Sequence, residues 1–157
     1  MISTAIEDPA QPEIIRMLED GEAASASLYP AERNHHLPLD SLRAPQVLFH
    51  VARDAAGRAL GTGAVVLKGN DAGARWAEIK RMWTDPAARG QGVAAAMLAA
   101  LEAAARARGV RLLRLETGNV SHAALGLYRR FGYAEISAFE GYVPDPLSVF
   151  MEKRLSA

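Results

Sequence analysis

The hydrophobic pattern in the first half of the chain predicts one helix followed by an antiparallel meander. Apolar residues between Ile14 and Leu18 recur at helical spacing, after a short candidate strand at residues 2–6. Apolar and β-branched residues then gather in three segments that short turns separate: 47–53, 60–67 and 76–83. Because turns this short join antiparallel neighbours, we expect the three segments to pair as a meander.

The second half of the chain predicts two helices that alternate with strands. Between Val93 and Ala105, apolar residues fall on one face of a helix, and Gly109 is well placed to end it. The remaining predicted elements are a strand at 110–116, a helix at 121–131, and strands at 134–138 and 148–153. This order of elements predicts an α+β (mixed α/β) domain around one central sheet.

Length and composition narrow the class of protein. With 157 residues the chain is the size of one domain, so we expect residues 1–157 to form a single unit. Half of the residues are apolar and 23% are charged, which is typical of a globular protein. Lys and Arg total 18, as do Asp and Glu, and this balance argues against nucleic acid or an acidic membrane as a partner.

The sequence also lacks cysteine and targeting signals. Without cysteine there can be no disulfide, no thiolate metal site and no cysteine nucleophile. The adjacent His35 and His36 do not have the spacing of a helical metal site, so we expect no metal. The longest apolar stretch, Val93 to Leu101, is far shorter than the ~20 residues that span a bilayer, and the N-terminus carries no signal pattern. We therefore expect a cytoplasmic protein.

The most informative segment joins a strand to a helix through a loop that contains glycine. Arg89, Gly90 and Gly92 immediately precede the helix that begins at Val93. Glycines let backbone N–H groups approach a ligand, and a helix N-terminus offers unpaired N–H donors with a partial positive charge. Together with Arg89, these groups predict an anion site suited to phosphate. The alternative is a turn whose glycines cap the helix and bind nothing.

The segment Arg89-Gly90-Gln91-Gly92-Val93-Ala94 resembles the acyl-CoA signature of the GNAT superfamily of N-acetyltransferases, Arg/Gln-x-x-Gly-x-Gly/Ala. The strand at 78–82 is similar to the family's fourth strand, and residues 119–133 are similar to its later helix and the turn after it. The end of the chain, 148–153, resembles the last strand of many small members. The resemblance covers residues 47–154. It implies a central, mostly antiparallel twisted sheet with splayed fourth and fifth strands, flanked by helices.

A dinucleotide-binding fingerprint is the competing interpretation of this loop. Gly90, Gly92 and Ala95 have its spacing, and Glu116 ends the next predicted strand. Two observations weigh against it. The strand at 78–81 is too polar for a buried central parallel strand, and the chain between this strand and the glycines is longer than the tight dinucleotide turn.

The resemblance to the GNAT superfamily implies a site for acetyl-CoA as co-substrate, where the fourth and fifth strands part. The pantetheine arm would bond the backbone near Met82 to Thr84, the pyrophosphate would lie on residues 89–94, and Asn119 would bond the CoA arm. Trp83 either packs on the cofactor or fills the core, and Asn119 is otherwise a turn residue. The cofactor-binding residues implied in this way are Met82, Trp83, Thr84, Arg89, Gly90, Gln91, Gly92, Val93, Ala94 and Asn119.

The same resemblance implies two catalytic residues. Glu78 resembles the family's glutamate base, which takes the proton of the amine through water. Tyr128 resembles the tyrosine that protonates the leaving thiolate, and a phenol with a pKa of about 10 is protonated at pH 7. The backbone N–H of Met82 would polarise the thioester carbonyl. The alternatives are a solvated strand glutamate and a helix tyrosine that closes the core.

The sequence therefore predicts an N-acetyltransferase that moves an acetyl group from acetyl-CoA to a primary amine of a small molecule. With no cysteine and no Gly-x-Ser-x-Gly elbow, direct attack in a ternary complex is favoured over an acyl-enzyme. The alternatives are a protein or peptide N-acetyltransferase and a non-catalytic acyl-CoA sensor. The segment with His35 and His36, and the loop with Tyr142, Pro144 and Asp145, are candidate walls of the acceptor pocket. The resemblance also allows a homodimer.

Overall fold

The computed structural model describes residues 1–30 and 37–156. His35 and His36 lie outside the described residues. The helices and strands follow one another in this order: β1 (Ser3–Ile6), α1 (Pro12–Leu28), α2 (Leu39–Leu42), β2 (Val47–Arg53), β3 (Ala59–Asp71), β4 (Ala74–Thr84), a 3-10 turn (Pro86–Ala88), α3 (Val93–Ala107), β5 (Leu112–Gly118), α4 (His122–Arg130), β6 (Ala134–Ile136) and β7 (Ser148–Arg154). This order is the predicted one.

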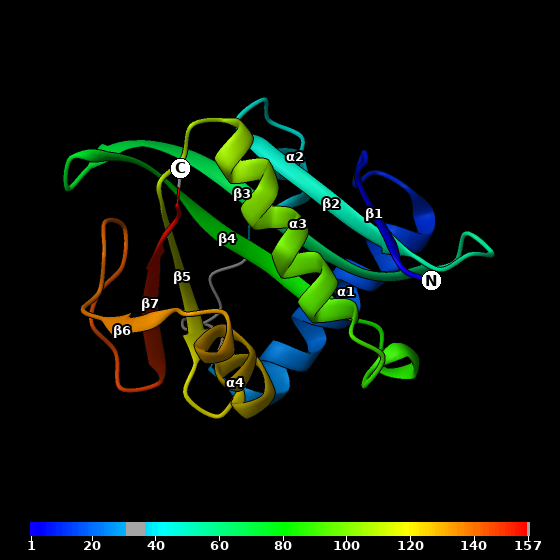
Figure 1. Ribbon diagram of the computed structural model, residues 1–157. Coiled ribbons are helices and arrows are strands. Elements are labelled where there is room, and N and C mark those ends of the chain that lie inside the picture. The colour runs from blue at the N-terminus through cyan, green and yellow to red at the C-terminus, as the bar shows by residue number, and fades with distance from the viewer. Residues whose placement is uncertain (31–36, 157) are drawn as a thin grey trace.

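Within the described residues, the strands form one seven-stranded sheet in the order β1-β2-β3-β4-β5-β7-β6. The pairs β1–β2, β2–β3, β3–β4, β5–β7 and β6–β7 are antiparallel, and β4–β5 is parallel. The sheet is strongly twisted, with α3 across one face and α1 on the other (Figure 1). The predicted mixed α+β fold with a mostly antiparallel sheet is confirmed.

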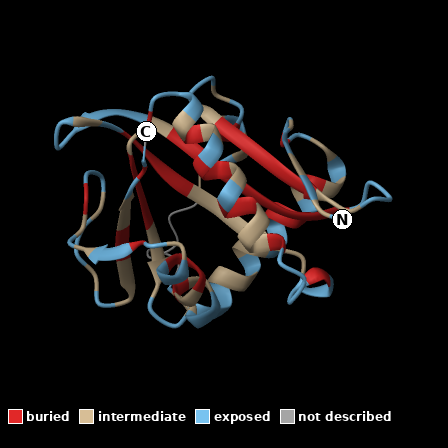
Figure 2. Cartoon of the chain, in the orientation of Figure 1, coloured by how far each residue is buried: buried red, intermediate tan, exposed pale blue. Residues whose placement is uncertain are grey.

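The central strands of the sheet are covered on both faces, and the red stretches of β2, β3 and β4 in Figure 2 mark their buried residues. In β2, Leu48 and Ala52 belong to the core under α3, whereas Phe49 and Val51 pack with α1 on the opposite face. Side chains alternate between the faces of a strand, so a continuous apolar run is what a strand covered on both sides requires. The apolar stripe of α1, which begins with Ile14, supplies the second cover.

The turn between β3 and β4 is tighter than predicted. The cluster of Gly, Asn and Asp at 69–73 reads as a loop, but the strands continue to Asp71 and resume at Ala74. The two loop residues, Ala72 and Gly73, have φ angles of 51° and 76°. Positive φ at both positions is the geometry of a type I′ turn, which matches the twist of the flanking strands.

Two irregularities interrupt the middle of the sheet: a bulge between β3 and β4, and a separation of β4 from β5. The register of β3 against β4 shifts between Thr62 and Ala64, and opposite this shift Arg81 has a φ of 59°. The parallel pairing of β4 with β5 stops at Ile79 and Leu115, although both strands run on. The predicted splay of the fourth and fifth strands is therefore present, and it opens the sheet beyond Ile79.

Candidate active site

A cleft of about 950 Å³ occupies the place where β4 and β5 part. Its walls come from α1, the parted ends of β4 and β5, the loop before α3, the first turns of α3 and α4, and the segment before β7. Most of the predicted site residues line it: Glu78, Met82, Trp83, Thr84, Arg89, Gly90, Gly92, Val93, Ala94 and Tyr128. The fold thus brings predicted residues from three separate segments of the chain to one cavity.

The loop before α3 forms a backbone cradle at one end of this cleft. Gly90 and Gly92 have φ angles of 81° and 84°, and a Cβ on either would meet nothing within 4 Å. The first bond inside the helix runs from the Ala96 N–H to the Gly92 carbonyl at 3.0 Å. The N–H groups of the first turn of α3 are therefore left for a ligand. This open, donor-rich loop fits a pyrophosphate such as that of acetyl-CoA.

A cation stands beside the cradle. The guanidinium carbon of Arg89 lies 4.9 Å from the centre of the Trp83 ring. The ring in turn packs against Gly21 of α1, where a Cβ would lie 3.5 Å from the indole. Trp83 therefore belongs both to the core beside α1 and to the cleft wall, so the two readings of this residue are not exclusive.

Two predicted cofactor residues lie apart from the others. Neither Gln91 nor Asn119 is among the residues that line the cleft, and both are exposed. The Asn119 side chain donates to the carbonyl of Pro146 at 3.1 Å, which ties the turn after β5 to the segment before β7. This contact is of the kind expected for a turn residue, and the cofactor role of Asn119 stays a prediction.

Glu78 is buried in the sheet, with 2% of its surface exposed. Its Oε2 accepts the hydrogen of the Tyr142 hydroxyl and lies 3.4 Å from Lys80 Nζ. Its Oε1 lies 3.7 Å from Lys68 Nζ. Two cations and a phenol replace the water that a carboxylate loses on burial. The alternative of a solvated strand glutamate does not describe this residue.

The burial of Glu78 corrects one argument from the sequence. The polarity of residues 78–81 had weighed against a buried central parallel strand, yet β4 stands in the middle of the sheet and pairs in parallel with β5. Ala77 and Ile79 face the core under α3, while Glu78 points to the opposite face, where its charge is paired. The rejection of the dinucleotide fold still holds, because the sheet is mostly antiparallel.

Tyr142 is the site residue that sequence reasoning named only as part of a loop. Its hydroxyl donates to Glu78 and accepts a hydrogen bond of 2.8 Å from Lys80 Nζ. Burial and the neighbouring Glu78 carboxylate raise the pKa of the Tyr142 phenol far above its usual range. The ring packs edge-on against Phe139 and Phe150, with centroids 5.0 and 5.4 Å away.

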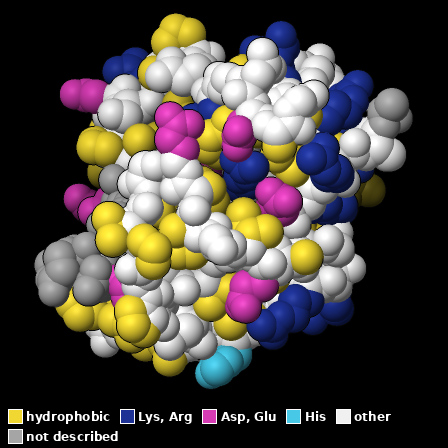
Figure 3. All heavy atoms as spheres, turned by 90° about the vertical axis from the view of Figure 1, so that its left-hand side faces the viewer, with side chains coloured by type: hydrophobic (Ala, Val, Ile, Leu, Met, Phe, Trp, Pro, Cys, Tyr) yellow, Lys and Arg dark blue, Asp and Glu magenta, His cyan; other side chains and the backbone are white. Residues whose placement is uncertain are grey.

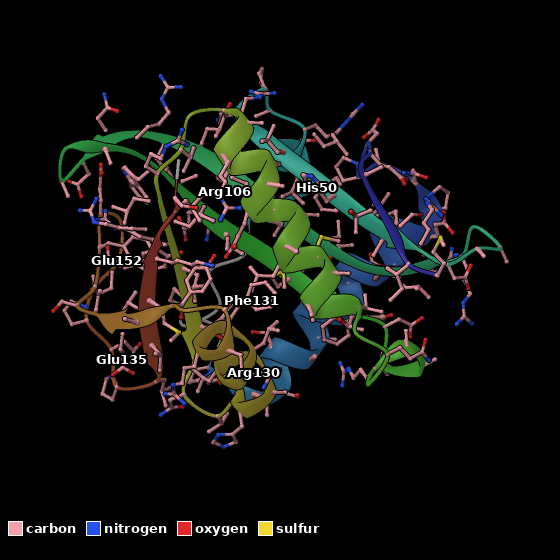
Figure 4. The ribbon with its side chains drawn as sticks, viewed as in Figure 1. His50, Arg106, Arg130, Phe131, Glu135 and Glu152 are labelled. Atoms are coloured by element: carbon pink, nitrogen blue, oxygen red, sulfur yellow. The ribbon has the colours of Figure 1, made fainter. Side chains whose placement is uncertain are left out.

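An ionic cluster around Arg114 lies on the same side of the sheet. The Arg114 guanidinium stacks 4.9 Å from the centre of Trp76. It donates to Asp71 at 2.7 Å and to Glu152 of β7 at 3.1 Å; Figure 4 labels Glu152 on that strand. Arg114 therefore joins the β3–β4 hairpin to β5 and β7, which fixes the face of the sheet that carries Glu78.

Tyr128 stands on α4, buried at 5% exposure, and lines the cleft. Its ring meets Tyr133 edge-on at 5.8 Å between centroids. Burial raises the pKa of the Tyr128 phenol well above its usual value, so the group stays protonated at physiological pH. The residue is thus both part of the core and a proton-bearing group on the cleft wall.

The fold and the cleft combine an open glycine loop at the start of α3 with a buried carboxylate and two phenols. The model of the acetyltransferase (GNAT) family matches residues 13–133. This chain belongs to that family and is an acetyl-CoA-dependent N-acetyltransferase.

Relatives with high coverage agree with this assignment. A protein of Azospirillum brasilense named IAA acetyltransferase is 40% identical over 154 residues, which is 98% of each chain. A Klebsiella pneumoniae structure, described provisionally as an acyl-CoA N-acyltransferase, has 40% identity, a TM-score of 0.81 and 99% coverage of each chain. The PaiA N-acetyltransferase of Thermoplasma acidophilum, solved with coenzyme A, shares the fold at 16% identity, a TM-score of 0.73 and 99% coverage of each chain.

Three further observations concern the described part of the chain. No helix in residues 1–30 and 37–156 combines the length and apolar character needed to cross a bilayer. The same residues gather no group of three or more His, Asp or Glu side chains that could hold a metal ion. On the face that carries β6 and the β3–β4 hairpin, side chains of both charges are exposed (Figure 3).

Proposed function

We propose that this N-acetyltransferase moves an acetyl group to a primary amine of a small molecule, by direct attack while both substrates are bound. The observation that carries the proposal is the buried Glu78 carboxylate in the same cleft as the glycine cradle. Acetyl-CoA supplies an activated acyl group when bound. The protein must then hold it, take one proton from the amine and return one to the thiolate.

The groups that would hold acetyl-CoA lie along one side of the cleft. The Gly90 and Gly92 backbone and the Arg89 guanidinium would receive the pyrophosphate. Beyond Ile79 the edge of β4 is released from β5, so the backbone from Met82 to Thr84 is available to an extended ligand. The Met82 N–H is the donor we assign to the thioester carbonyl, because a preorganised donor stabilises the charge that develops on that oxygen.

Two side chains would move protons. Glu78 takes the proton that the amine loses as it forms the new N–C bond, since an ammonium has no lone pair with which to attack. Tyr128 gives its proton to the departing sulfur. At neutral pH the phenol is protonated and has a proton to give, although burial raises its pKa and makes it a weaker acid than an ordinary phenol.

The size of the cleft supports a small acceptor. Its volume of about 950 Å³ must contain the acyl donor's arm as well as the amine. Small-molecule sites occupy roughly 300–1,000 Å³ in total. The space left for the acceptor is therefore limited, with α1 on one side and the segment before β7 on another. Peptide acetylation and acyl-CoA sensing without catalysis are the alternatives that the experiment must separate.

The test is thiol release from acetyl-CoA in the presence of small amines, amino acids and peptides. We expect turnover with small primary amines. Glu78→Gln should lower kcat by about 10²–10⁴-fold and leave acetyl-CoA affinity unchanged, and the loss should shrink as rising pH frees the amine. As the binding control, Gly92→Asp places a carboxylate in the cradle and should abolish acetyl-CoA binding. Because residue 92 has a φ of 84°, the thermal unfolding midpoint should fall by about 2–8 °C while the protein still folds.

Each alternative has its own outcome in this test. Turnover with peptides alone would identify a peptide acetyltransferase. Tight acetyl-CoA binding without turnover on any acceptor would identify a sensor. A fully active Glu78→Gln variant would leave the glutamate with a structural role.

A further inference from the structure

We propose that Tyr142 is a catalytic residue that relays the proton of the acceptor amine to Glu78. This inference rests on the proposed function, in which Glu78 is the base. It replaces the water expected between amine and glutamate by a side chain of the protein. Tyr142 and Glu78 both line the cleft, although 63 residues separate them in the sequence.

The contacts of the Glu78 carboxylate leave few routes for a proton. Its side chain is 3% exposed, Oε1 faces Lys68, and Oε2 faces Lys80 and the Tyr142 hydroxyl. An ammonium has hydrogens to donate and no lone pair with which to accept one. A phenol does both. Among the described side chains in contact with this carboxylate, Tyr142 is the one that can accept a proton from the cleft and pass one on.

The transfer balances without any further reactant. The amine nitrogen forms its bond to the acyl carbon with its lone pair and becomes positively charged. Its N–H bond then breaks, the electron pair stays on nitrogen, and the proton goes to the Tyr142 oxygen. The O–H bond of Tyr142 breaks at the same time, and that proton goes to Oε2 of Glu78. Tyr142 is a neutral phenol before and after the step, and Glu78 ends as a carboxylic acid.

The electrostatics around Tyr142 suit a relay and disfavour an independent base. Its raised pKa means that the phenol does not ionise by itself near neutral pH. Transfer therefore requires that a proton arrives as one leaves. The ammonium of Lys80, 2.8 Å from the phenol oxygen, stabilises the partial negative charge that appears there during such a transfer.

The hydroxyl is also held in place from several directions. The Tyr142 N–H donates to the Phe139 carbonyl at 3.0 Å, and the ring packs edge-on against Phe139 and Phe150. Lys80 lies over the ring as well as against the hydroxyl, with Nζ 5.4 Å from the centroid. A phenol fixed by its backbone, its ring and its oxygen has little freedom to lose when the amine arrives.

The chain contains a matched control outside the cleft. Tyr133 donates its hydroxyl to a second buried glutamate, Glu102, at 2.9 Å, and Lys153 Nζ lies 2.9 Å from the same carboxylate. This cluster has the same three residue types, but neither Tyr133 nor Glu102 lines the cleft. Tyr133→Phe therefore removes the same kind of hydrogen bond without touching the proposed route.

The experiment compares Tyr142→Phe with Tyr133→Phe in single turnover, so that product release does not mask chemistry. For Tyr142→Phe we expect a rate loss of about 10²-fold or more, with acetyl-CoA affinity within about twofold of wild type. Tyr133→Phe should keep the rate within about twofold. The rate as a function of the D₂O fraction should be curved for wild type, because two protons move together, and linear for Tyr142→Phe.

A hydroxyl that merely held Glu78 in position would give a linear D₂O dependence in wild type, which would overturn the relay. So would a wild-type rate in Tyr142→Phe. If that variant fails to fold, a difluorotyrosine at position 142 keeps the ring and hydroxyl but is more acidic. The relay then requires a changed rate at an unchanged thermal midpoint, and an unchanged rate refutes it. If wild type turns over no amine, the proposed function fails as well, whereas turnover without dependence on Tyr142 defeats the relay alone.

Discussion

Gly61 offers a direct test of how the fold sets the cleft. This residue of β3 pairs with Thr84, beside the bulge of β4. A Cβ at position 61 would lie 2.6 Å from the carbonyl oxygen of Trp83 and 3.0 Å from Val93 Cγ1. The first of these atoms belongs to the backbone and cannot rotate away. Gly61→Ala must therefore displace the end of β4.

The size of the effect follows from these distances. Ordinary contact begins near 3.4 Å, so the Trp83 carbonyl must move by about 0.8 Å, the difference between 3.4 and 2.6 Å. Overpacking of this kind costs roughly 1–3 kcal/mol. For a domain of this size each kcal/mol lowers the unfolding midpoint by about 2–4 °C, so we expect a fall of about 2–12 °C. A shift near 1 Å in a catalytic strand can lower the rate by about 10²-fold.

The matched control is Gly69→Ala on the same strand, where a Cβ would meet nothing within 4 Å. Calorimetric unfolding and acetyl-CoA titration should be measured on both variants. Gly61→Ala should lose both stability and affinity, because Met82 and Thr84 line the cleft from the displaced segment. Equal stability and equal affinity in the two variants would show that β4 does not need the missing side chain at position 61.

Two other residues give predictions of different kinds. Tyr128→Phe keeps the ring contact with Tyr133, so the free energy of unfolding should change by ~1 kcal/mol or less. In the same variant kcat at saturating acetyl-CoA should fall more than tenfold, and an acyl donor with a better leaving group should recover part of that loss. Full activity of the variant would rule out the acid role of Tyr128. His50 of β2 (Figure 4) is buried, and burial lowers its pKa from 6.5. Below pH 6.5 the unfolded chain therefore binds a proton at His50 more readily than the folded chain does. The free energy of unfolding consequently decreases as the pH is lowered. Urea unfolding should be measured at pH 7 and pH 5. Between these two values the free energy of unfolding should decrease less for His50→Gln than for wild type. An equal decrease in both proteins would assign the pH dependence to other groups.

Local patterns were sufficient to predict most of the fold. The apolar face from Val93 to Ala105 and the glycines before it are short-range signals, and they located α3 and the glycine turn before it correctly. The length of α1 was harder to predict. It runs to Leu28 although its apolar positions cluster near its start, and Gly21 is accommodated because the Trp83 ring packs against it. That contact depends on β4, which lies far along the chain.

The partners of the predicted catalytic residue could not be predicted in the same way. Glu78 was identified from its strand, but the residue that donates to it lies 64 positions further along the chain. The connection depends on the sheet order: β7 lies between β5 and β6, so the segment between β6 and β7 returns across the face that carries Glu78. The contact of Asn119 is also of this kind, because its side chain donates to the carbonyl of Pro146, 27 positions along the chain.

The two Tyr–Glu–Lys clusters show that burial alone does not identify a catalytic carboxylate. Glu78 and Glu102 are 2% and 4% exposed, and each has a tyrosine hydroxyl and a lysine as partners. Burying such a pair costs desolvation that the attraction between the charges often only balances, so neither cluster is explained by stability alone. Glu102 joins α3 to β7 within the core. Glu78 and its tyrosine line the cleft where the strands part, and this position is the reason why we propose a catalytic use for one cluster and not for the other.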